Sequence, residues 1–277
     1  MQAVEDDAGH WRARLDLGFE ARGQRTVLGR RRQEGPLTVQ RAFYPEGATC
    51  HVYVLHPPGG IVGGDRLEIA ADVAADARVL LTQPGAAKFY RSAGATAVQR
   101  SGLAVADGGA LEWLPQEQIL FPGARVRSTT RVVLNGGARF IGWEVLCLGR
   151  PVIGERFQVG RADLCLSVER DGRPVLIERL AIVDGRGLDG PSGLRGLPVS
   201  GTLVAAGAGA GDLAAAREVL DDRPALVAGV TLLGDVLIAR ALAGRVEPVM
   251  HCFRTLWTVL RPRLLGIAAR PPRIWAT

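Results

Sequence analysis

The stretch RVRSTTRVVLNGGARFIGWEVLCLG, residues 125–149, decides the fold class of this chain. β-branched residues and alternation of apolar with polar positions mark its first half, and its second half is an almost continuous apolar run. Both patterns are typical of β-strands. The Asn-Gly pair at Asn135 is typical of a hairpin turn. The stretch therefore predicts two strands joined by a hairpin.

The same pattern extends over most of the first 205 residues, for example in CHVYVLHP, RVLLTQP and DLCLSVERDGRPVLIERLAIV. Gly, Pro, Asn or Asp closes most of these runs, and RDGRP at Arg170 predicts a second hairpin. Strands at this spacing, with no long amphipathic helix between them, favour antiparallel sheets. No repeat of fixed length is evident.

The pattern changes after residue 205. GAGAGDLAAAREVLDD predicts a short helix capped by Asp212, and LVAGVTLLGDVLIARALAG returns to strand. EPVMHCFRTLWTVLRPRLLG predicts a longer helix that Pro262 kinks or ends. Its apolar face comprises Val249, Cys252, Phe253, Leu256, Trp257 and Leu260.

The expected fold is therefore mainly β, with stacked antiparallel or mixed sheets and a small helical portion near the C-terminus. We expect one domain over residues 1–277, with a β-rich body at about 12–205 and a helix-containing portion at about 206–277.

Composition narrows the possible environments and partners. The chain is 47% hydrophobic and 22% charged, and charges interrupt every apolar run before it reaches the length of a membrane span. The acidic N-terminus lacks an apolar signal core, and the four cysteines show no C-x-x-C spacing. We expect a cytoplasmic protein without a membrane segment.

The net charge of +6 permits an acidic partner. The arginines are scattered with few aromatic residues among them, so nucleic acid is not the expected partner. The short cluster Arg30–Arg32 is either a solvated strand end or a partner contact. Lys88 is the only lysine, which indicates either a site where a compact ammonium group fits or chance.

The sequence lacks the common motifs of nucleophilic and metal-dependent enzymes. There is no G-x-S-x-G, and Cys50 and His51 project to opposite faces of one strand. His-x-His, His-x-x-x-His and Cys-x-x-Cys spacings are missing as well. His56, beside Pro57, is either a weak metal ligand or a turn residue. We expect a protein that is not an enzyme; a hydrolase using Asp65 or Glu144 as a base would still need a nucleophile.

The segment LHPPGGIVGGDRL, residues 55–67, has the glycine spacing of a phosphate-binding loop. Asp65 and Arg66 stand where such a loop needs Lys and Ser or Thr, so nucleotide binding is rejected. The four glycines predict a tight turn, which leaves Asp65 free for a second role. These glycines are Gly59, Gly60, Gly63 and Gly64.

Three further acids are candidates for a functional role. Glu144 and Glu178 lie in apolar strands, and Glu155 follows a glycine in PVIGERF. A charge in an apolar strand is costly unless it is paired or lines a wet cavity. These acids therefore either pair with arginines such as Arg156 or Arg179, or line a water-filled passage whose oxygen ligands hold a divalent cation loosely.

Several long motifs resemble the urease accessory protein D family, which is called UreD, or UreH in some bacteria. They are LHPPGGIVGGD, TQPGAAKFYRS, LEWLPQEQILFPGA, GWEVLCLGRPVIGERF and the terminal PPRIWAT. The resemblance covers residues 12–277, and the first ten residues match nothing. Ile153 departs from it, because a small or polar residue is expected before GE.

The resemblance implies a largely β scaffold for urease maturation rather than an enzyme. Such a scaffold binds the urease apoprotein and accessory protein F, which recruits the GTPase called accessory protein G and allows a dimer. Nickel passes toward the urease site by an internal tunnel, so it is cargo in transit and not a tightly bound cofactor. The alternative is an adaptor that joins urease to the GTPase complex without carrying nickel.

Under this resemblance the candidate residues fall into two groups. We expect metal transit to involve Asp65, Glu144, Glu178, Glu155 and His56. Partner binding is assigned to two sets of residues. Lys88, Tyr90 and Arg91 either bind a partner or shape the wall of the passage. Trp257, Arg273 and Trp275 are candidates for binding accessory protein F. A structural role is preferred for Tyr90, and core packing is the alternative for Trp257.

Overall fold

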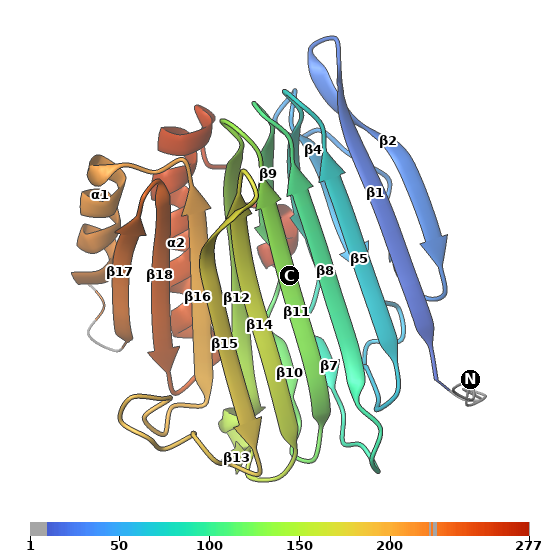
Figure 1. The fold of residues 1–277 in the computed structure, drawn as a ribbon, viewed down its shortest axis with the longest axis vertical. Helices are drawn as coiled ribbons and strands as arrows, with labels where there is room; N and C mark the ends of the chain where they lie inside the picture. Colours follow the sequence, from blue (N-terminus) through green and yellow to red (C-terminus); the bar gives the residue numbers. More distant parts are fainter. Residues whose placement is uncertain (1–9, 222, 224–225, 277) are drawn as a thin grey trace.

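The computed structural model describes residues 10–221, 223 and 226–276. Two β-sheets pack face to face, and one long helix covers the far side of one of them (Figure 1). We call the sheet at the front of Figure 1 the open sheet and the sheet between it and the helix the middle sheet.

The open sheet has the strand order β15-β14-β11-β8-β5-β1-β2. Its strands are β1 (Arg12–Arg22), β2 (Arg25–Glu34), β5 (Arg66–Val73), β8 (Ala97–Val105), β11 (Arg125–Leu134), β14 (Arg161–Arg170) and β15 (Arg173–Val183).

The middle sheet has the order β17-β18-β16-β12-β9-β6-β4-β3. Its strands are β3 (Thr38–Val39), β4 (Cys50–Leu55), β6 (Arg78–Thr82), β9 (Ala110–Leu114), β12 (Arg139–Arg150), β16 (Val199–Ala206), β17 (Val227–Leu233) and β18 (Val236–Ala243). Short strands at its margin are β7 (Ala87–Phe89), β10 (Gln118–Leu120) and β13 (Glu155–Arg156).

Parallel pairing dominates the body of both sheets. Strands β5, β8, β11 and β14 are parallel neighbours, and so are β4, β6, β9 and β12. The chain visits the two sheets in turn, so each strand lies beside the strand from the preceding coil. This winding is a β-solenoid with coils of unequal length, since successive strands of the open sheet begin at residues 66, 97, 125 and 161.

The mainly β fold with mixed sheets and helices near the C-terminus is confirmed, but the preference for antiparallel pairing is wrong for this body. The hairpin at Asn135 is also wrong, because β11 and β12 belong to different sheets. The turn itself exists: the Ala138 N–H donates to the Asn135 carbonyl at 3.0 Å. A tight turn fixes the reversal of the chain but does not decide whether the next strand lies beside the first or in the facing sheet.

Hairpins do close the ends of the solenoid. β14 and β15 pair antiparallel through Asp171 and Gly172, whose φ angles of 51° and 74° suit a two-residue turn. β1 pairs with β2, and β17 with β18, in the same way. The turn expected at Arg170 is therefore confirmed.

The core has two layers, and β12 contributes to both. Phe140, Leu146 and Leu148 enter the layer between the sheets, whereas Ile141 and Trp143 enter the layer between the middle sheet and the helix. Burial on both faces explains why the second half of the opening stretch is apolar almost throughout. The cysteines are free thiols, and three of them are buried: Cys50, Cys147 and Cys252.

Helix α2 (Val246–Leu265) buries the expected apolar face against the middle sheet. Pro262 lies inside it, and the helix ends one turn later at Gly266, whose φ is 67°. Helix α1 (Ala210–Asp221) contains Asp212 within its first turn rather than at the cap position. The Asp212 carboxylate reaches back and accepts the Gly209 N–H at 2.8 Å.

Two short 3₁₀ helices complete the chain: η1 (Pro151–Ile153) and η2 (Arg273–Ala276). In the part of the chain that the structure describes, no helix is both long enough and apolar enough to cross a membrane.

Candidate functional site

Two of the expected acids meet in the space between the sheets. Glu144 projects from β12 of the middle sheet and accepts the hydroxyl of Thr130, on β11 of the open sheet, at 2.5 Å. Glu178 projects from β15 and accepts the hydroxyl of Thr202 at 3.0 Å and the Nε–H of Arg240 at 3.1 Å. Both acids line one cavity of about 70 Å³. Residues far apart in the sequence are therefore joined by the facing of the two sheets.

The two carboxylates have different electrostatic surroundings. Burial raises the pKa of Glu144 to about 7, and the negative charge of Glu178 adds to this rise, while the Thr130 hydroxyl opposes it. One oxygen of Glu178, Oε2, is buried and has no hydrogen-bond partner among the described residues. The pair thus offers one carboxyl that gains or loses its proton near neutral pH and one unsatisfied carboxylate oxygen.

A polar layer continues from this pair into the inter-sheet core. We define the polar layer as the buried hydroxyl and amide side chains on the inward faces of β8 and β11. Thr130 stands beside Ser101 in the parallel register, and Ser128 stands beside Gln99. Ser101, Ser128 and Thr130 are all buried. Burying hydroxyls in a core of aliphatic residues is costly unless they bond to one another or to water, which favours a hydrated layer.

The layer reaches a second cavity of about 240 Å³, which Gln99 also lines. His56 lines this cavity, and burial lowers the pKa of its ring, although the nearby charge of Asp65 opposes the shift. The His56 Nε2 atom is buried without a hydrogen-bond partner among the described residues. The neutral imidazole is therefore available as a weak nitrogen ligand. Lys88 is exposed and lines the same cavity.

Asp65 does not face water as expected. Its carboxylate is buried and accepts the backbone N–H groups of Trp11 at 3.0 Å and Val62 at 2.9 Å. It closes the glycine-rich turn and ties that turn to the first strand. The expectation that Asp65 lines a passage is therefore corrected: both of its oxygens are committed to backbone donors.

Glycine is required at the four positions of this turn for two different structural reasons. Gly59 and Gly64 have φ angles of 71° and 99°, which side chains other than glycine rarely adopt. A Cβ on Gly60 would overlap the ring of Tyr90. A Cβ on Gly63 would overlap Ser92 and Ala95 in the loop after Tyr90. The turn therefore packs its backbone directly against the KFYRS segment.

Glu155 lies apart from the other acids. It pairs with Arg150 at 2.5 and 2.9 Å at the protein surface and does not line the cavity that Glu144 lines. Its assignment to the passage is therefore corrected in favour of the ion-pair alternative. Arg156 and Arg179, the two expected partners, bind aspartates instead.

The aromatic candidates near the C-terminus are mostly internal. Trp257 is fully buried and donates its Nε1–H to Glu112 at 2.6 Å, so its assignment as a partner contact is wrong and core packing is correct. Trp275 folds back onto Trp257 with ring centroids 5.3 Å apart and is half-buried. The guanidinium of Arg254 covers the Trp275 ring, whereas Arg273 stays exposed.

The KFYRS candidates are accessible. Lys88 and Arg91 are exposed, and Tyr90 is 40% exposed with its ring against Phe121. The structural role preferred for Tyr90 fits its contact with the glycine turn, and its exposed edge leaves room for a partner.

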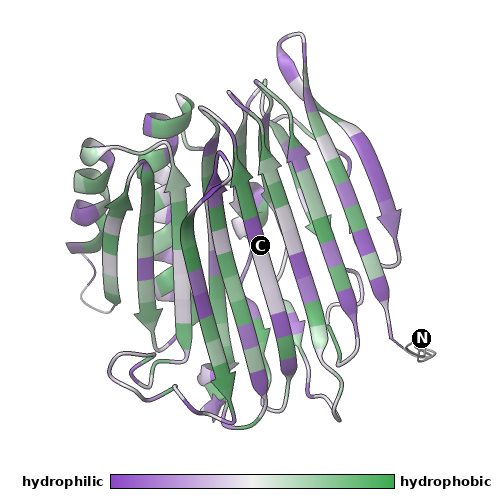
Figure 2. Cartoon of the chain, in the orientation of Figure 1, coloured by the Kyte–Doolittle hydropathy of each residue, from purple (hydrophilic) through white to green (hydrophobic). Residues whose placement is uncertain are grey.

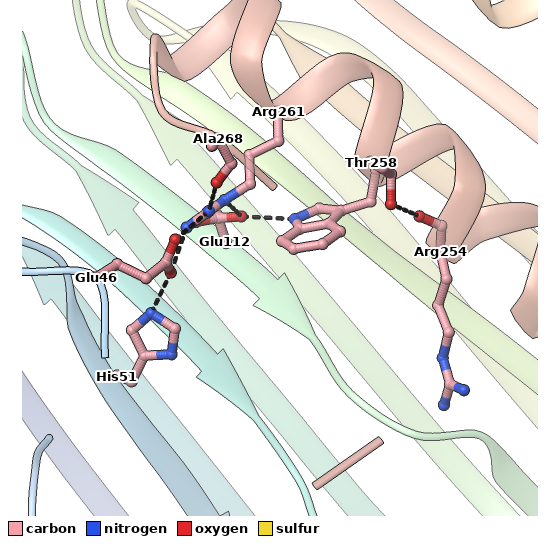
Figure 3. Close-up of polar contacts among 8 residues, drawn as sticks. Glu46, His51, Glu112, Arg254, Thr258, Arg261 and Ala268 are labelled. Atoms are coloured by element: carbon pink, nitrogen blue, oxygen red, sulfur yellow. Dashed lines mark hydrogen bonds and ion pairs between the residues drawn. The ribbon is translucent and has the colours of Figure 1, made fainter. Parts of the chain in front are cut away.

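A buried ion network was not predicted (Figure 3). Arg261, on α2, is fully buried and donates to Glu112 of β9 at 2.9 and 3.0 Å and to Glu46 at 2.8 Å. The Nε2 atom of His51 lies 2.6 Å from Oε1 of Glu46, the same oxygen that accepts the 2.8 Å hydrogen bond from Arg261. Arg261 also donates to the Ala268 carbonyl. The signal for Glu112 was present, since it is an acid within the apolar run ALEWLP.

The pKa values of the two glutamates in this network move in opposite directions. Burial raises the pKa of Glu112, although the Arg261 charge opposes this. Burial alone would raise the pKa of Glu46 too, but hydrogen bonds from His51 and Arg261 lower it to about 2. The network fastens α2 to the middle sheet and to the loop before β4, and it is structural.

A cavity of about 610 Å³ lies beside the N-terminal half of α2. Exposed Val152 and Ile153 stand at its edge. Its other lining residues include Ile119, Cys147, Met250, His251 and Arg254. Within the residues that the structure describes, no group of three His, Cys, Asp or Glu side chains is placed to hold a metal ion.

Fold and site together define a class of protein: a two-sheet β-solenoid scaffold whose core carries a polar layer with a pair of acids. The model of the UreD urease accessory protein family matches residues 11–276, so the chain belongs to this family. The resemblance drawn from the sequence motifs is thereby confirmed. Membership places the chain among the non-catalytic factors of urease maturation and nickel incorporation.

Curated relatives agree over the full length. The chain is 50% identical over 277 residues to the urease accessory protein UreD of Pseudomonas putida strain W619, covering 100% of this chain and 98% of the relative. It is 46% identical to UreD of Alcanivorax borkumensis, over 96% of this chain and 92% of the relative. It is 49% identical to UreD of Dechloromonas aromatica, over 96% of this chain and 95% of the relative.

Proposed function

We propose that this chain is a urease maturation scaffold that passes nickel through its polar layer to the urease apoprotein. The observation that carries the proposal is the Glu144–Glu178 pair, in which one carboxyl has a pKa of about 7 and the other has an unsatisfied oxygen. A divalent cation that displaces the Glu144 proton gains two carboxylate ligands.

Such a site suits cargo better than storage. Carboxylate and hydroxyl oxygens bind nickel less tightly than clusters of imidazole and thiolate do, so the ion can leave. Proton exchange at Glu144 provides a route for release, because a returning proton competes with the metal for the same oxygen. Ser101, Ser128 and Gln99 extend the oxygen surface toward the second cavity, where the His56 ring supplies one nitrogen.

The proposed partners are the urease apoprotein, accessory protein F and, through F, the GTPase called accessory protein G, all in the cytoplasm. We assign F to the surface around the cavity beside α2. Val152 and Ile153 are more than 60% exposed there, and exposed apolar side chains beside a cavity are typical of protein contacts. The folded tail adjoins this surface through Trp275, whose ring is covered by Arg254 of the cavity lining. Exposed Arg273 of the same tail is assigned to F as well, and a dimer forms through F.

The alternative is an adaptor that joins urease to F and G without carrying nickel. The exposed apolar surface beside α2 favours this function as much as it favours the scaffold, because it requires only binding. The two functions differ in whether the acids of the polar layer are needed.

The test is co-expression of urease with accessory proteins F and G, with this chain, without it, or with the variant E144Q/E178Q. E155Q is the matched control, because Glu155 is a surface acid outside the cavity. Urease activity, nickel per urease and co-purification of the complex are measured together.

Without this chain, we expect folded urease that lacks nickel and activity. E144Q/E178Q is expected to form the complex but to deliver no more nickel than cells without the chain, whereas E155Q delivers the normal amount. Full nickel loading by E144Q/E178Q would establish the adaptor instead. Full loading without the chain would overturn the maturation role altogether.

A further inference from the structure

The outer face of the open sheet has no covering layer in the described part of the chain (Figure 1). Helix α2 covers only the middle sheet, and the apolar core lies on the inner side of the open sheet. Parallel sheets are normally covered on both faces. Figure 2 shows polar residues alternating with apolar ones along the strands of this face.

This face carries most of the positive charge of the chain. Leaving out residues 20–25 at the β1–β2 turn, the pairing register places eleven arginines and six acids on it, an excess of five positive charges, against +6 for the whole chain. The arginines are Arg12, Arg14, Arg30, Arg32, Arg66, Arg100, Arg125, Arg127, Arg131, Arg161 and Arg179. The acids are Asp16, Glu34, Glu68, Asp72, Asp163 and Glu169.

Most of these acids form ion pairs on the face, but one end of the sheet is different. The parallel strands β1, β5, β11 and β14 all begin with arginine, and they begin at the same end of the sheet. Arg12 stands beside Arg66, and Arg125 stands beside Arg161. Among the described residues, Arg66, Arg125 and Arg161 form no ion pair with an acid. We call these first residues the arginine row.

Like charges placed side by side on neighbouring strands destabilise a sheet. Arg125 and Arg161, which stand side by side and form no ion pair among the described residues, therefore cost folding stability, and an acidic partner would offset that cost. The centre of the face is shallow, since Ala70, Gly102 and Ala104 stand outward there. A shallow face with a charged border fits a broad folded surface better than it fits a peptide segment.

We infer that the outer face of the open sheet docks an acidic surface of the urease apoprotein, steered by the arginine row. The six acids on the face and the absence of aromatic residues from its outward positions disfavour nucleic acid, which would meet repulsion and find nothing to stack on. The face also adjoins the acid pair, because Leu164, Cys165 and Leu166 of β14 line the same cavity as Glu144 and Glu178.

The inference rests on the proposed function, which supplies urease as the partner. The test measures the affinity of the complex between this chain and accessory protein F for purified urease apoprotein, at low and at physiological salt. The variant is R66E/R125E/R161E, and R66Q/R125Q/R161Q is a milder form. The matched control R217E/R245E/R270E changes the charge equally at exposed arginines outside the open sheet.

We expect roughly 10-fold or greater loss of affinity for R66E/R125E/R161E, a smaller loss for the Gln variant, and a weaker dependence of binding on salt. The control is expected to bind within about twofold of the wild type. Far-UV circular dichroism checks that each variant is folded. Unchanged affinity of both arginine-row variants would overturn the inference, as would tighter binding of duplex DNA than of urease by the wild-type chain.

The two proposals can fail separately. The test of the polar layer reads nickel transfer in a complex that still forms, with E144Q/E178Q expected to bind urease normally. The present test reads binding alone, with the polar layer intact. Lost binding by the arginine-row variant supports docking here even if E144Q/E178Q transfers nickel as the wild type does.

Discussion

At the scale of single residues, burial of Glu144 has a structural cost and changes the pKa of its carboxyl. Its carboxyl is enclosed between two sheets, and the Thr130 hydroxyl does not fully compensate for the lost water. The raised pKa is the result, and it makes the proton exchangeable near pH 7. Asp65 is the opposite case, because its buried carboxylate accepts a backbone N–H group at each oxygen and holds the glycine-rich turn.

The raised pKa of Glu144 predicts a pH-dependent stability. The folded protein holds this proton more tightly than the unfolded chain does, so Glu144 lowers stability as the pH rises from about 4.5 to about 7. Glu144→Gln removes this cost, and we expect it to stabilise the protein at pH 8 by on the order of 3 kcal/mol and to be neutral near pH 4.5. Chemical unfolding at several pH values measures the difference.

The control for that prediction is Glu155→Gln, since Glu155 is an exposed ion-pair partner with a lowered pKa. It should show no gain in stability at pH 8. A Glu144→Gln variant that loses the same stability at every pH would show that the carboxyl has an ordinary pKa and acts only through its hydrogen bond.

At the scale of elements, helix α2 depends on one buried cation. Arg261 lies on the face of the helix that packs against the middle sheet, and its charge is balanced by Glu112 from β9 and Glu46 from the loop before β4. The same guanidinium holds the Ala268 carbonyl, so the tail after the helix is fixed by the same group. Trp257 packs against the Arg261 guanidinium, and Trp275 packs against Trp257.

Arg261→Met is therefore expected to destabilise the protein by about 3–5 kcal/mol, because two buried glutamates lose their shared cation. Arg263→Met is the matched control on the same helix. Arg263 forms an ion pair with Asp212, but its side chain is exposed, so we expect a loss of stability below about 1 kcal/mol. Urea unfolding followed by tryptophan fluorescence measures both. Equal losses for the two variants would mean that the network carries no more free energy than a surface pair.

At the scale of the whole molecule, the solenoid winding builds a polar layer between two sheets from residues of many coils. The polar layer runs from the cavity of the acid pair toward the cavity of His56. A residue in the middle of the layer can therefore be substituted without changing Glu144, Glu178 or His56. Ser128 occupies that middle, on the inward face of β11. Thr231 is an exposed threonine on β17, outside both the polar layer and the open sheet.

Ser128→Leu is expected to stop nickel delivery while the complex with urease still forms, because it replaces a hydroxyl with an apolar side chain in the layer. Its cost in stability is about 1–3 kcal/mol, which circular dichroism and thermal unfolding check. Thr231→Leu, the matched control, should deliver nickel normally. The readout is nickel per purified urease, and normal loading with Ser128→Leu would exclude a route through this layer.

Some features of the site followed from local rules. Glu144 and Glu178 were found because a charge in an apolar strand needs a partner or water, and that reasoning is independent of the fold. The same rule applied to Glu112 would have found the Arg261 network. Glu155 was misassigned because a glycine before an acid marks only a turn, and the sequence does not show that Arg150 returns to meet it.

The sequence by itself determined the strands, helix α2, the hairpin at Asp171 and the family, because periodicity, turn chemistry and motifs are local properties. The tertiary structure alone decided that the strands pair mainly in parallel and that Asn135 leads to the facing sheet. It also placed Glu144 opposite Glu178 and gathered the arginine row at one end of the open sheet. These facts depend on which distant strands become neighbours, and that choice is made by burying the whole core at once, not by any single stretch of the chain.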